Sequence, residues 1–159
     1  MMANGSLNYT VKGICIGMKV TWNYTPPTNG GDTFTSIKKG SKATLKIVQD
    51  EKNGFVKELY IQKEPDIDNR TFEAQLQKTV EQLQITYPFL SVKNKKNGTY
   101  LIDIPQEKRL GHEEHFSKVA KAFLHYVDNK DMPEWENENT LAKYYITTTA
   151  VEMAKKGNK

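Results

Sequence analysis

The chain has 159 residues, of which 37% are hydrophobic and 26% are charged, and its formal net charge is +4. This length suits one hydrophobic core and is close to the common size of a domain, so we expect a single domain over residues 1–159. The arginines are Arg70 and Arg109 alone, and the lysines are scattered along the chain. Nucleic-acid-binding proteins usually cluster their basic charge and use arginine, so we expect no nucleic-acid partner.

Cysteine content and hydropathy exclude further classes of protein. Cys15 is the single cysteine, which rules out an intramolecular disulfide and a zinc site built from thiolates. No apolar run has the length of a membrane-spanning helix, and the first residues lack the pattern of a secretory signal. We expect no membrane partner, a cytoplasmic location by default, and a periplasmic location as the alternative for a longer parent protein.

The first part of the chain has the alternation of β-strands. After a short strand that ends near Gly13, apolar residues take every second position on one face, which we expect to be buried: Ile14, Ile16, Met18, Val20, Trp22 and Tyr24. A loop rich in proline and glycine follows at 26–31. Further strands are predicted at 33–38, 42–49 and 58–63, and five strands without an intervening helix predict antiparallel pairing.

The second part of the chain changes to helical spacing. Asp68 or Asn69 can cap a helix that runs toward Pro88, and Asn97 with Gly98 predicts the turn of a hairpin over 91–95 and 100–104. Two more helices are predicted at 112–128 and 139–155. We therefore expect an α+β fold, a two-layer sandwich in which three helices cover one face of an antiparallel sheet of about seven strands. The uncovered sheet face would then be an interaction surface.

His112 and His115 are the candidate metal ligands. They lie three residues apart, so a helix places both rings on nearly the same face, but the zinc-protease motif has a spacing of four. His125 points about 80° away on a straight helix and cannot complete a mononuclear site with them. A metal hydrolase would need a carboxylate from elsewhere as its third ligand. The alternative, which we favour, is that the two histidines begin a helix that packs against the sheet, with no metal.

Chemical motifs for catalysis are missing from the chain. The sequence has no Gly-x-Gly-x-x-Gly, no phosphate-binding Gly-Lys-Ser/Thr loop and no Gly-x-Ser-x-Gly elbow, so we predict no catalytic and no cofactor-binding residue. The best candidates for binding a sugar or polyol are Trp22, Asn23, Tyr24 and Asp32, because aromatic faces beside amides and carboxylates suit such ligands. The alternative for the two aromatic residues is packing in the core.

The chain resembles the C-terminal domain of oxidoreductases of the Gfo/Idh/MocA type over nearly its whole length. Several spaced segments carry the resemblance in the same order: residues 9–13, 20–24, 31–33 and 40–43, then Gly111, His112, Glu113, His115 and Phe116, then 133–135, 142–145 and Thr148. In this resemblance His112 and His115 are a signature of the helix start.

The resemblance implies a substrate-binding and assembly domain of a two-domain enzyme that acts on a sugar or polyol. The N-terminal dinucleotide-binding domain is absent from this chain, so we expect NAD or NADP to bind the full-length parent but not this chain. The expected partners are that domain and a second copy of the chain, bound through the open sheet face. The rival hypothesis is a stand-alone carbohydrate-binding module that uses Trp22 and Tyr24.

Overall fold

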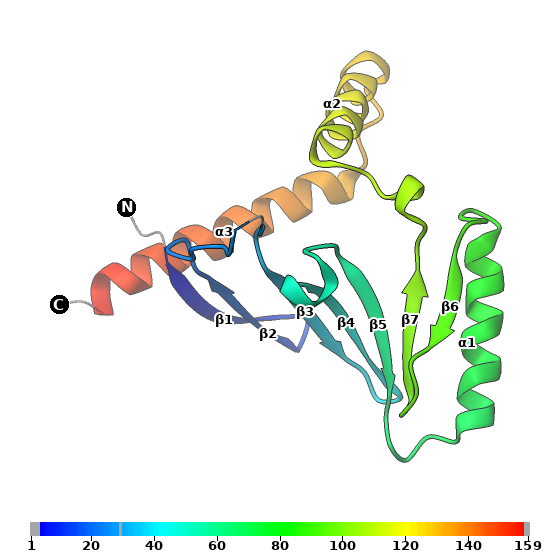
Figure 1. Cartoon of the computed structure of the whole chain (residues 1–159). Coiled ribbons are helices and arrows are strands. Elements are labelled where there is room, and N and C mark those ends of the chain that lie inside the picture. The colour runs from blue at the N-terminus through cyan, green and yellow to red at the C-terminus, as the bar shows by residue number, and fades with distance from the viewer. Residues whose placement is uncertain (1–3, 29, 158–159) are drawn as a thin grey trace. The chain divides into compact units, whose positions relative to one another are not determined.

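The computed structural model describes residues 4–28 and 30–157 and has seven antiparallel strands and three α-helices (Figure 1). This confirms the predicted α+β class. The chain forms two compact units, which we name the sheet unit, Pro26–Leu110, and the hairpin–helix unit, Met1–Thr25 with Gly111–Lys159. The seven strands divide accordingly into a five-stranded sheet and a two-stranded hairpin. The expectation of a single domain stays a prediction, and each unit is described by itself.

The sheet unit contains the five-stranded sheet, in which every neighbouring pair is antiparallel. Its spatial order is β3-β4-β5-β7-β6, so the last hairpin joins the sheet through β7. The strands are β3 (Phe34–Lys39), β4 (Ala43–Gln49), β5 (Glu58–Lys63), β6 (Ser91–Asn94) and β7 (Thr99–Asp103). Two short 3₁₀ turns, Glu51–Asn53 and Gln106–Lys108, complete the connections.

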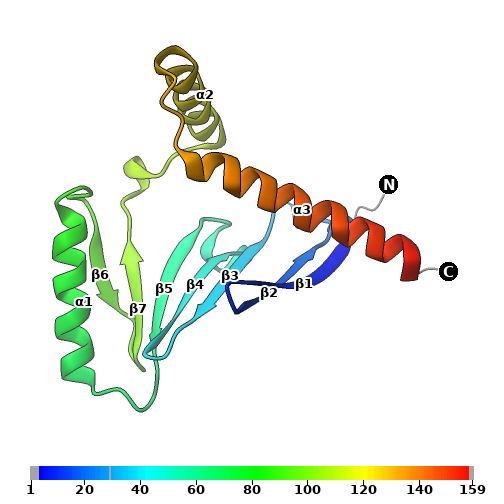
Figure 2. The same ribbon diagram turned by 180° about the vertical axis from the view of Figure 1, so that it is seen from behind.

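Helix α1 (Asn69–Gln84) packs against one face of this sheet and lies beside β6 and β7 in both ribbon views (Figures 1 and 2). Asp68 caps its first turn, because the carboxylate accepts a hydrogen bond of 2.8 Å from the backbone N–H of Thr71. The core lies between helix and sheet and consists of Val80, Leu90 and Ile102, with further apolar side chains around them.

Strand register decides which side chains face α1. Ile102 pairs with Leu59, and Tyr100 pairs with Ile61, so these alternate residues share the helix side of the sheet. Tyr100 also donates a hydrogen bond of 2.8 Å from its hydroxyl to Glu73 on α1. The residues between them point to the opposite face, which α1 leaves open.

The hairpin–helix unit begins with β1 (Gly5–Val11) and β2 (Ile14–Val20). Lys12 and Gly13 form the turn, and both have positive φ, 48° and 79°, as a type I′ hairpin turn requires. The alternating apolar side chains of β2 are not buried: Ile14, Met18 and Val20 are exposed. The unit continues with α2 (His112–Asn129) and α3 (Glu134–Gly157).

Two predicted boundaries in this unit are wrong. The strand predicted to reach Tyr24 ends at Val20, because the backbone N–H of Trp22 bonds to the side chain of Asn4 instead of continuing the ladder. The helix predicted to begin at Asn139 begins at Glu134, directly after Pro133. Within 4–28 and 30–157, no helix has both the length and the apolar character needed to cross a membrane.

Candidate functional site

Trp22 and Asn23 follow β2, and both are held by Asn4, which directly precedes the partner strand β1. The Asn4 side chain accepts a hydrogen bond of 2.6 Å from the Trp22 backbone N–H and donates one of 2.9 Å to the Asn23 side-chain oxygen. These bonds fix the backbone while the Trp22 side chain points away, 75% exposed. An exposed indole beside an amide can stack on the apolar face of a sugar ring.

Tyr24 and Asp32 complete the predicted binding set. Tyr24 is exposed in the same unit as Trp22, two residues farther along the chain. Asp32 belongs to the sheet unit, where its backbone carbonyl accepts a hydrogen bond of 2.8 Å from the Gln49 side chain. The structure therefore brings Trp22 and Asn23 together through Asn4, and the four-residue site stays a prediction.

His112 and His115 lie in the first turn of α2, where the sequence predicted a helix start. The His112 ring lies 5.7 Å from the Phe116 ring, between centroids, and the Glu114 carboxylate accepts a hydrogen bond of 2.8 Å from the Gly111 backbone N–H. In the described part of the chain, no three His, Cys, Asp or Glu side chains gather as a metal site would require. Their packing against a sheet is not observed, because α2 contains no buried residue.

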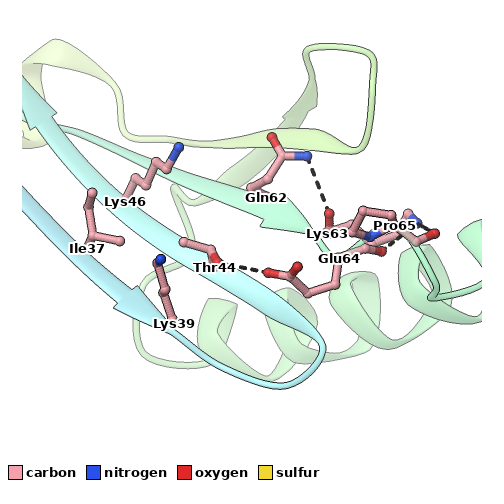
Figure 3. Close-up of a pocket in the computed structure, with 8 residues that line it drawn as sticks. All are labelled: Ile37, Lys39, Thr44, Lys46, Gln62, Lys63, Glu64 and Pro65. Carbon is pink, nitrogen blue, oxygen red and sulfur yellow. Dashed lines mark hydrogen bonds between the residues drawn. The ribbon is translucent and has the colours of Figure 1, made fainter. Parts of the chain in front are cut away.

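The open face of the five-stranded sheet carries a depression of about 500 Å³ that sequence reasoning did not identify (Figure 3). Its polar side chains come from three neighbouring strands, since Lys39 pairs with Thr44 and Thr44 pairs with Gln62. Lys46 lies on the same face of the sheet, two residues after Thr44 on β4. The signal in the sequence is the polar half of the alternation in β4 and β5.

Charge in this depression is mainly positive. Lys39 and Lys46 form no ion pair with any residue that the structure describes. Glu64, at the edge, accepts a hydrogen bond of 2.9 Å from the Thr44 hydroxyl. The Gln62 amide is held by the backbone carbonyls of Lys63 and Asn97 at 3.4 and 3.1 Å. The two free ammonium groups can donate hydrogen bonds to a polyhydroxylated or anionic ligand, whereas the protons of the Thr44 hydroxyl and the Gln62 amide are already donated within the protein.

A second depression adjoins the first on the same sheet face, because Lys46 is the cross-strand partner of Tyr60. The Tyr60 hydroxyl donates a hydrogen bond of 2.5 Å to the Glu58 carboxylate. This bond, with some desolvation and the nearby negative charge, raises the pKa of Tyr60 to about 12. Tyr60 is therefore neutral at physiological pH and acts as a hydrogen-bond donor, not as a base.

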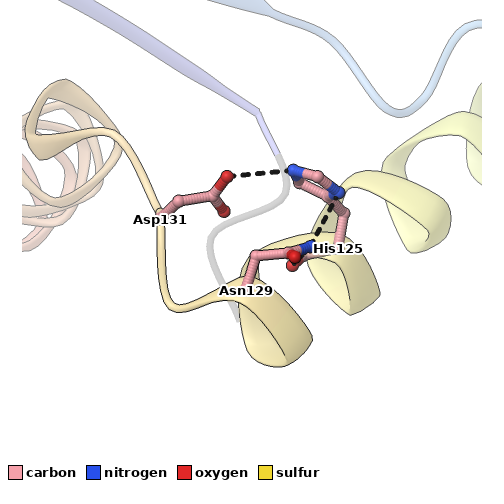
Figure 4. A network of polar contacts seen from close by, with 3 residues as sticks. All are labelled: His125, Asn129 and Asp131. Atoms are coloured by element: carbon pink, nitrogen blue, oxygen red, sulfur yellow. Dashed lines mark hydrogen bonds and ion pairs between the residues drawn. The ribbon is translucent and has the colours of Figure 1, made fainter.

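His125 is the third histidine, and its polar contacts hold the end of α2 (Figure 4). One ring nitrogen, Nε2, lies 3.0 Å from the Asp131 carboxylate, and Nδ1 lies 3.0 Å from the Asn129 side-chain amide. Lys130, between these two partners, has the left-handed φ of 54° that ends the helix. Because both ring nitrogens have partners, we assign this network the role of stabilising the C-terminal end of α2.

The fold and the sequence together define a C-terminal domain of oxidoreductases. Residues 1–155 match the family described as "Putative oxidoreductase C terminal domain", and the chain belongs to this family. It is also similar to a solved structure, a "putative oxidoreductase from Parabacteroides merdae ATCC 43184", with 39% sequence identity and a TM-score of 0.91. The match covers 96% of this chain and 35% of that one, so the chain spans about a third of the relative's length. No curated protein matches the chain.

Proposed function

We propose that this chain is the substrate-binding and assembly domain of an NAD(P)-dependent oxidoreductase of the Gfo/Idh/MocA type that acts on a sugar or polyol. The observation that carries the proposal is family membership over residues 1–155, joined to a 39% identical relative that is about three times longer. The dinucleotide-binding domain of the parent protein is the partner, and this chain alone is inactive.

The residues of this chain support a role in substrate binding, with cofactor binding left to the other domain of the parent protein. The sequence contains no glycine-rich phosphate fingerprint, so no residue here fits the role of holding NAD(P), which supplies hydride transfer when it is bound to the parent. The open sheet face instead offers the ammonium groups of Lys39 and Lys46 as hydrogen-bond donors, beside a Tyr60 hydroxyl whose proton is already donated to Glu58. Such donors can position the hydroxyl groups of a polyol by hydrogen bonds.

Substrate turnover by the parent protein tests this role. Purified parent protein is assayed for NAD(P)-dependent oxidation of a panel of sugars and polyols, followed by the absorbance of the reduced nicotinamide. Lys46→Met should raise KM with a smaller effect on kcat, because the lysine binds but does not react. Lys78→Met, an exposed change on α1, is the matched control and should leave both unchanged. Unchanged KM in the Lys46 variant would exclude the open face as the substrate site.

Assembly is the second part of the proposal. We place the contact between two copies on the open sheet face at the exposed Ile37, which lines the same depression, so the second copy would border the substrate site. Ile37→Glu should then lower the mass of the parent measured by light scattering, whereas Ile85→Glu on the far side of the sheet unit should not. Equal masses for the two variants would show that copies meet elsewhere.

A stand-alone carbohydrate-binding module is the alternative function, and the 75% exposure of Trp22 favours it. Titration calorimetry of the 159-residue chain with neutral oligosaccharides should then detect binding that Trp22→Ala abolishes. Trp135→Ala, at an exposed position of α3, is the control. Absence of heat with every sugar would remove this alternative and leave the domain proposal in place.

A further inference from the structure

Helix α2 carries an apolar face that no described residue of its own unit covers. We name Phe116, Val119, Phe123, Leu124 and Val127 the α2 stripe; each of these side chains is 54–69% exposed. Their spacing places them within one side of the helix. An exposed apolar face of this size on a helix is typical of a surface that binds another protein surface.

The opposite side of α2 is polar. Lys118 and Lys121 lie on that side with His125, which is held by Asp131 and Asn129. The helix is therefore amphipathic, with a polar side suited to solvent and an apolar side suited to contact with protein. Because the exposed charged side chains of the polar side suit water, the stripe is the part of α2 that favours a protein partner.

The hairpin–helix unit also lacks a core of its own. Every residue of the described chain that is buried belongs to the sheet unit, from Thr44 to Ile102. In the hairpin–helix unit, α2 and α3 contain no buried residue, and most of the apolar side chains of β2 are exposed. Burial of apolar surface is the main favourable contribution to folding, so this unit needs an additional surface to reach it.

The length of the relative points to a source of that surface. The chain matches 35% of a 39% identical structure, so about two thirds of that relative lies outside the match. We infer that the α2 stripe is the docking surface for the dinucleotide-binding domain of the parent protein. This inference rests on the proposed function for the identity of that domain, but the surface and its residues follow from the exposure of α2.

Hydroxyl-radical footprinting tests the inference without altering the fold. Oxidation of Phe116 and Phe123 is measured by mass spectrometry in the full-length parent and in the 159-residue chain, with the exposed side chain of Trp22 as an internal reference. We expect both phenylalanines to react readily in the 159-residue chain and to lose this reactivity in the parent at every concentration and mass. The same parent sample is titrated with NAD(P)H, so failure of the proposed function is detected separately.

Three outcomes would overturn the inference. Phenylalanines that react equally in chain and parent would show that no domain covers the stripe. Protection already present in the 159-residue chain would show that this chain covers it. Protection that appears in the parent only as its concentration and mass increase would assign the stripe to a second copy.

A pair of variants of the parent gives an independent readout. Phe123→Asp places a charge in the stripe at an exposed position, where α2 itself can tolerate it, and Lys118→Asp changes the opposite side of the same helix. We expect Phe123→Asp to split the thermal unfolding of the parent into two transitions, and Lys118→Asp to leave one. One unchanged transition in both variants would contradict the inference.

Discussion

The buried lysine of β5 allows the most quantitative prediction. Lys63 is 8% exposed, and its ammonium group donates hydrogen bonds to three backbone carbonyls in the connection to α1: Glu64 at 3.0 Å, Pro65 at 3.4 Å and Ile67 at 2.5 Å. These bonds tie the end of the sheet to the residues before the helix cap Asp68. Lys63→Met keeps the length of the side chain and removes all three donors.

The magnitude follows from two opposing contributions. Hydrogen bonds from a charged donor contribute about 1.5–3 kcal/mol each, and the one to the Ile67 carbonyl is short. A buried ammonium group costs several kcal/mol of desolvation, which methionine avoids. We expect the free energy of unfolding to fall by about 2 kcal/mol, because the carbonyls lose partners while only part of their hydration returns. For a chain of this size, that loss lowers Tm by roughly 4–8 °C.

Urea unfolding followed by circular dichroism measures this loss. Lys78→Met on the exposed side of α1 is the control and should stay within about 0.5 kcal/mol of the wild type. If Lys63→Met and Lys78→Met had the same unfolding midpoint, the carbonyl cluster would contribute nothing and the reasoning would be refuted.

Two further predictions concern a pKa and the core. Tyr60 has its pKa raised from 10.0 to about 12, so the folded state keeps a proton that the unfolded state loses between these values, and the free energy of unfolding should fall as pH rises through this window. Tyr60→Phe should remove that pH dependence and one phenolate signal near pH 12; loss of a signal near pH 10 instead would contradict the assignment. Ile102→Ala, in the core at 7% exposure, should cost about 2–5 kcal/mol. Ile85→Ala, at 86% exposure, should cost less than about 0.5 kcal/mol, and similar midpoints for the two variants would be inconsistent with a core between α1 and β7.

Strand positions were predicted well where alternation is strict. The prediction of a strand at 58–63 agrees with β5, Glu58–Lys63, and the first helix has the predicted cap Asp68. Alternation failed at Trp22, because a side chain, Asn4, replaces the strand partner there, and pattern alone cannot reveal such a contact. Helix α3 begins five residues before the predicted Asn139, directly after Pro133, a residue type that favours the first positions of helices.

Division of the strands into two sheets could not be predicted, because pairing between distant segments leaves no trace in local periodicity. The same limit applies to α2. A stripe such as Phe116, Phe123 and Val127 has the same spacing whether it is covered by the chain itself or by another surface. The sequence led us to expect a packed helix, and the structure leaves this stripe exposed.

Binding residues were harder to predict than the fold. Lys39, Thr44 and Gln62 are ordinary polar residues of three strands, and their proximity depends on the register of β3, β4 and β5. The chemistry of Trp22 predicts sugar binding, and the structure leaves this residue 75% exposed. Residue type alone therefore identifies single candidate side chains, whereas the polar face of the sheet can be recognised only from the pairing of its strands.

Cofactor binding tests the central claim most directly. Fluorescence titration with NADH and NADPH is carried out on the 159-residue chain and on the full-length parent under the same conditions. We predict saturable binding by the parent and none by the chain, because the chain lacks a phosphate-binding fingerprint and belongs to a C-terminal domain family. Tight, stoichiometric binding of either nucleotide by the 159-residue chain alone would contradict the account.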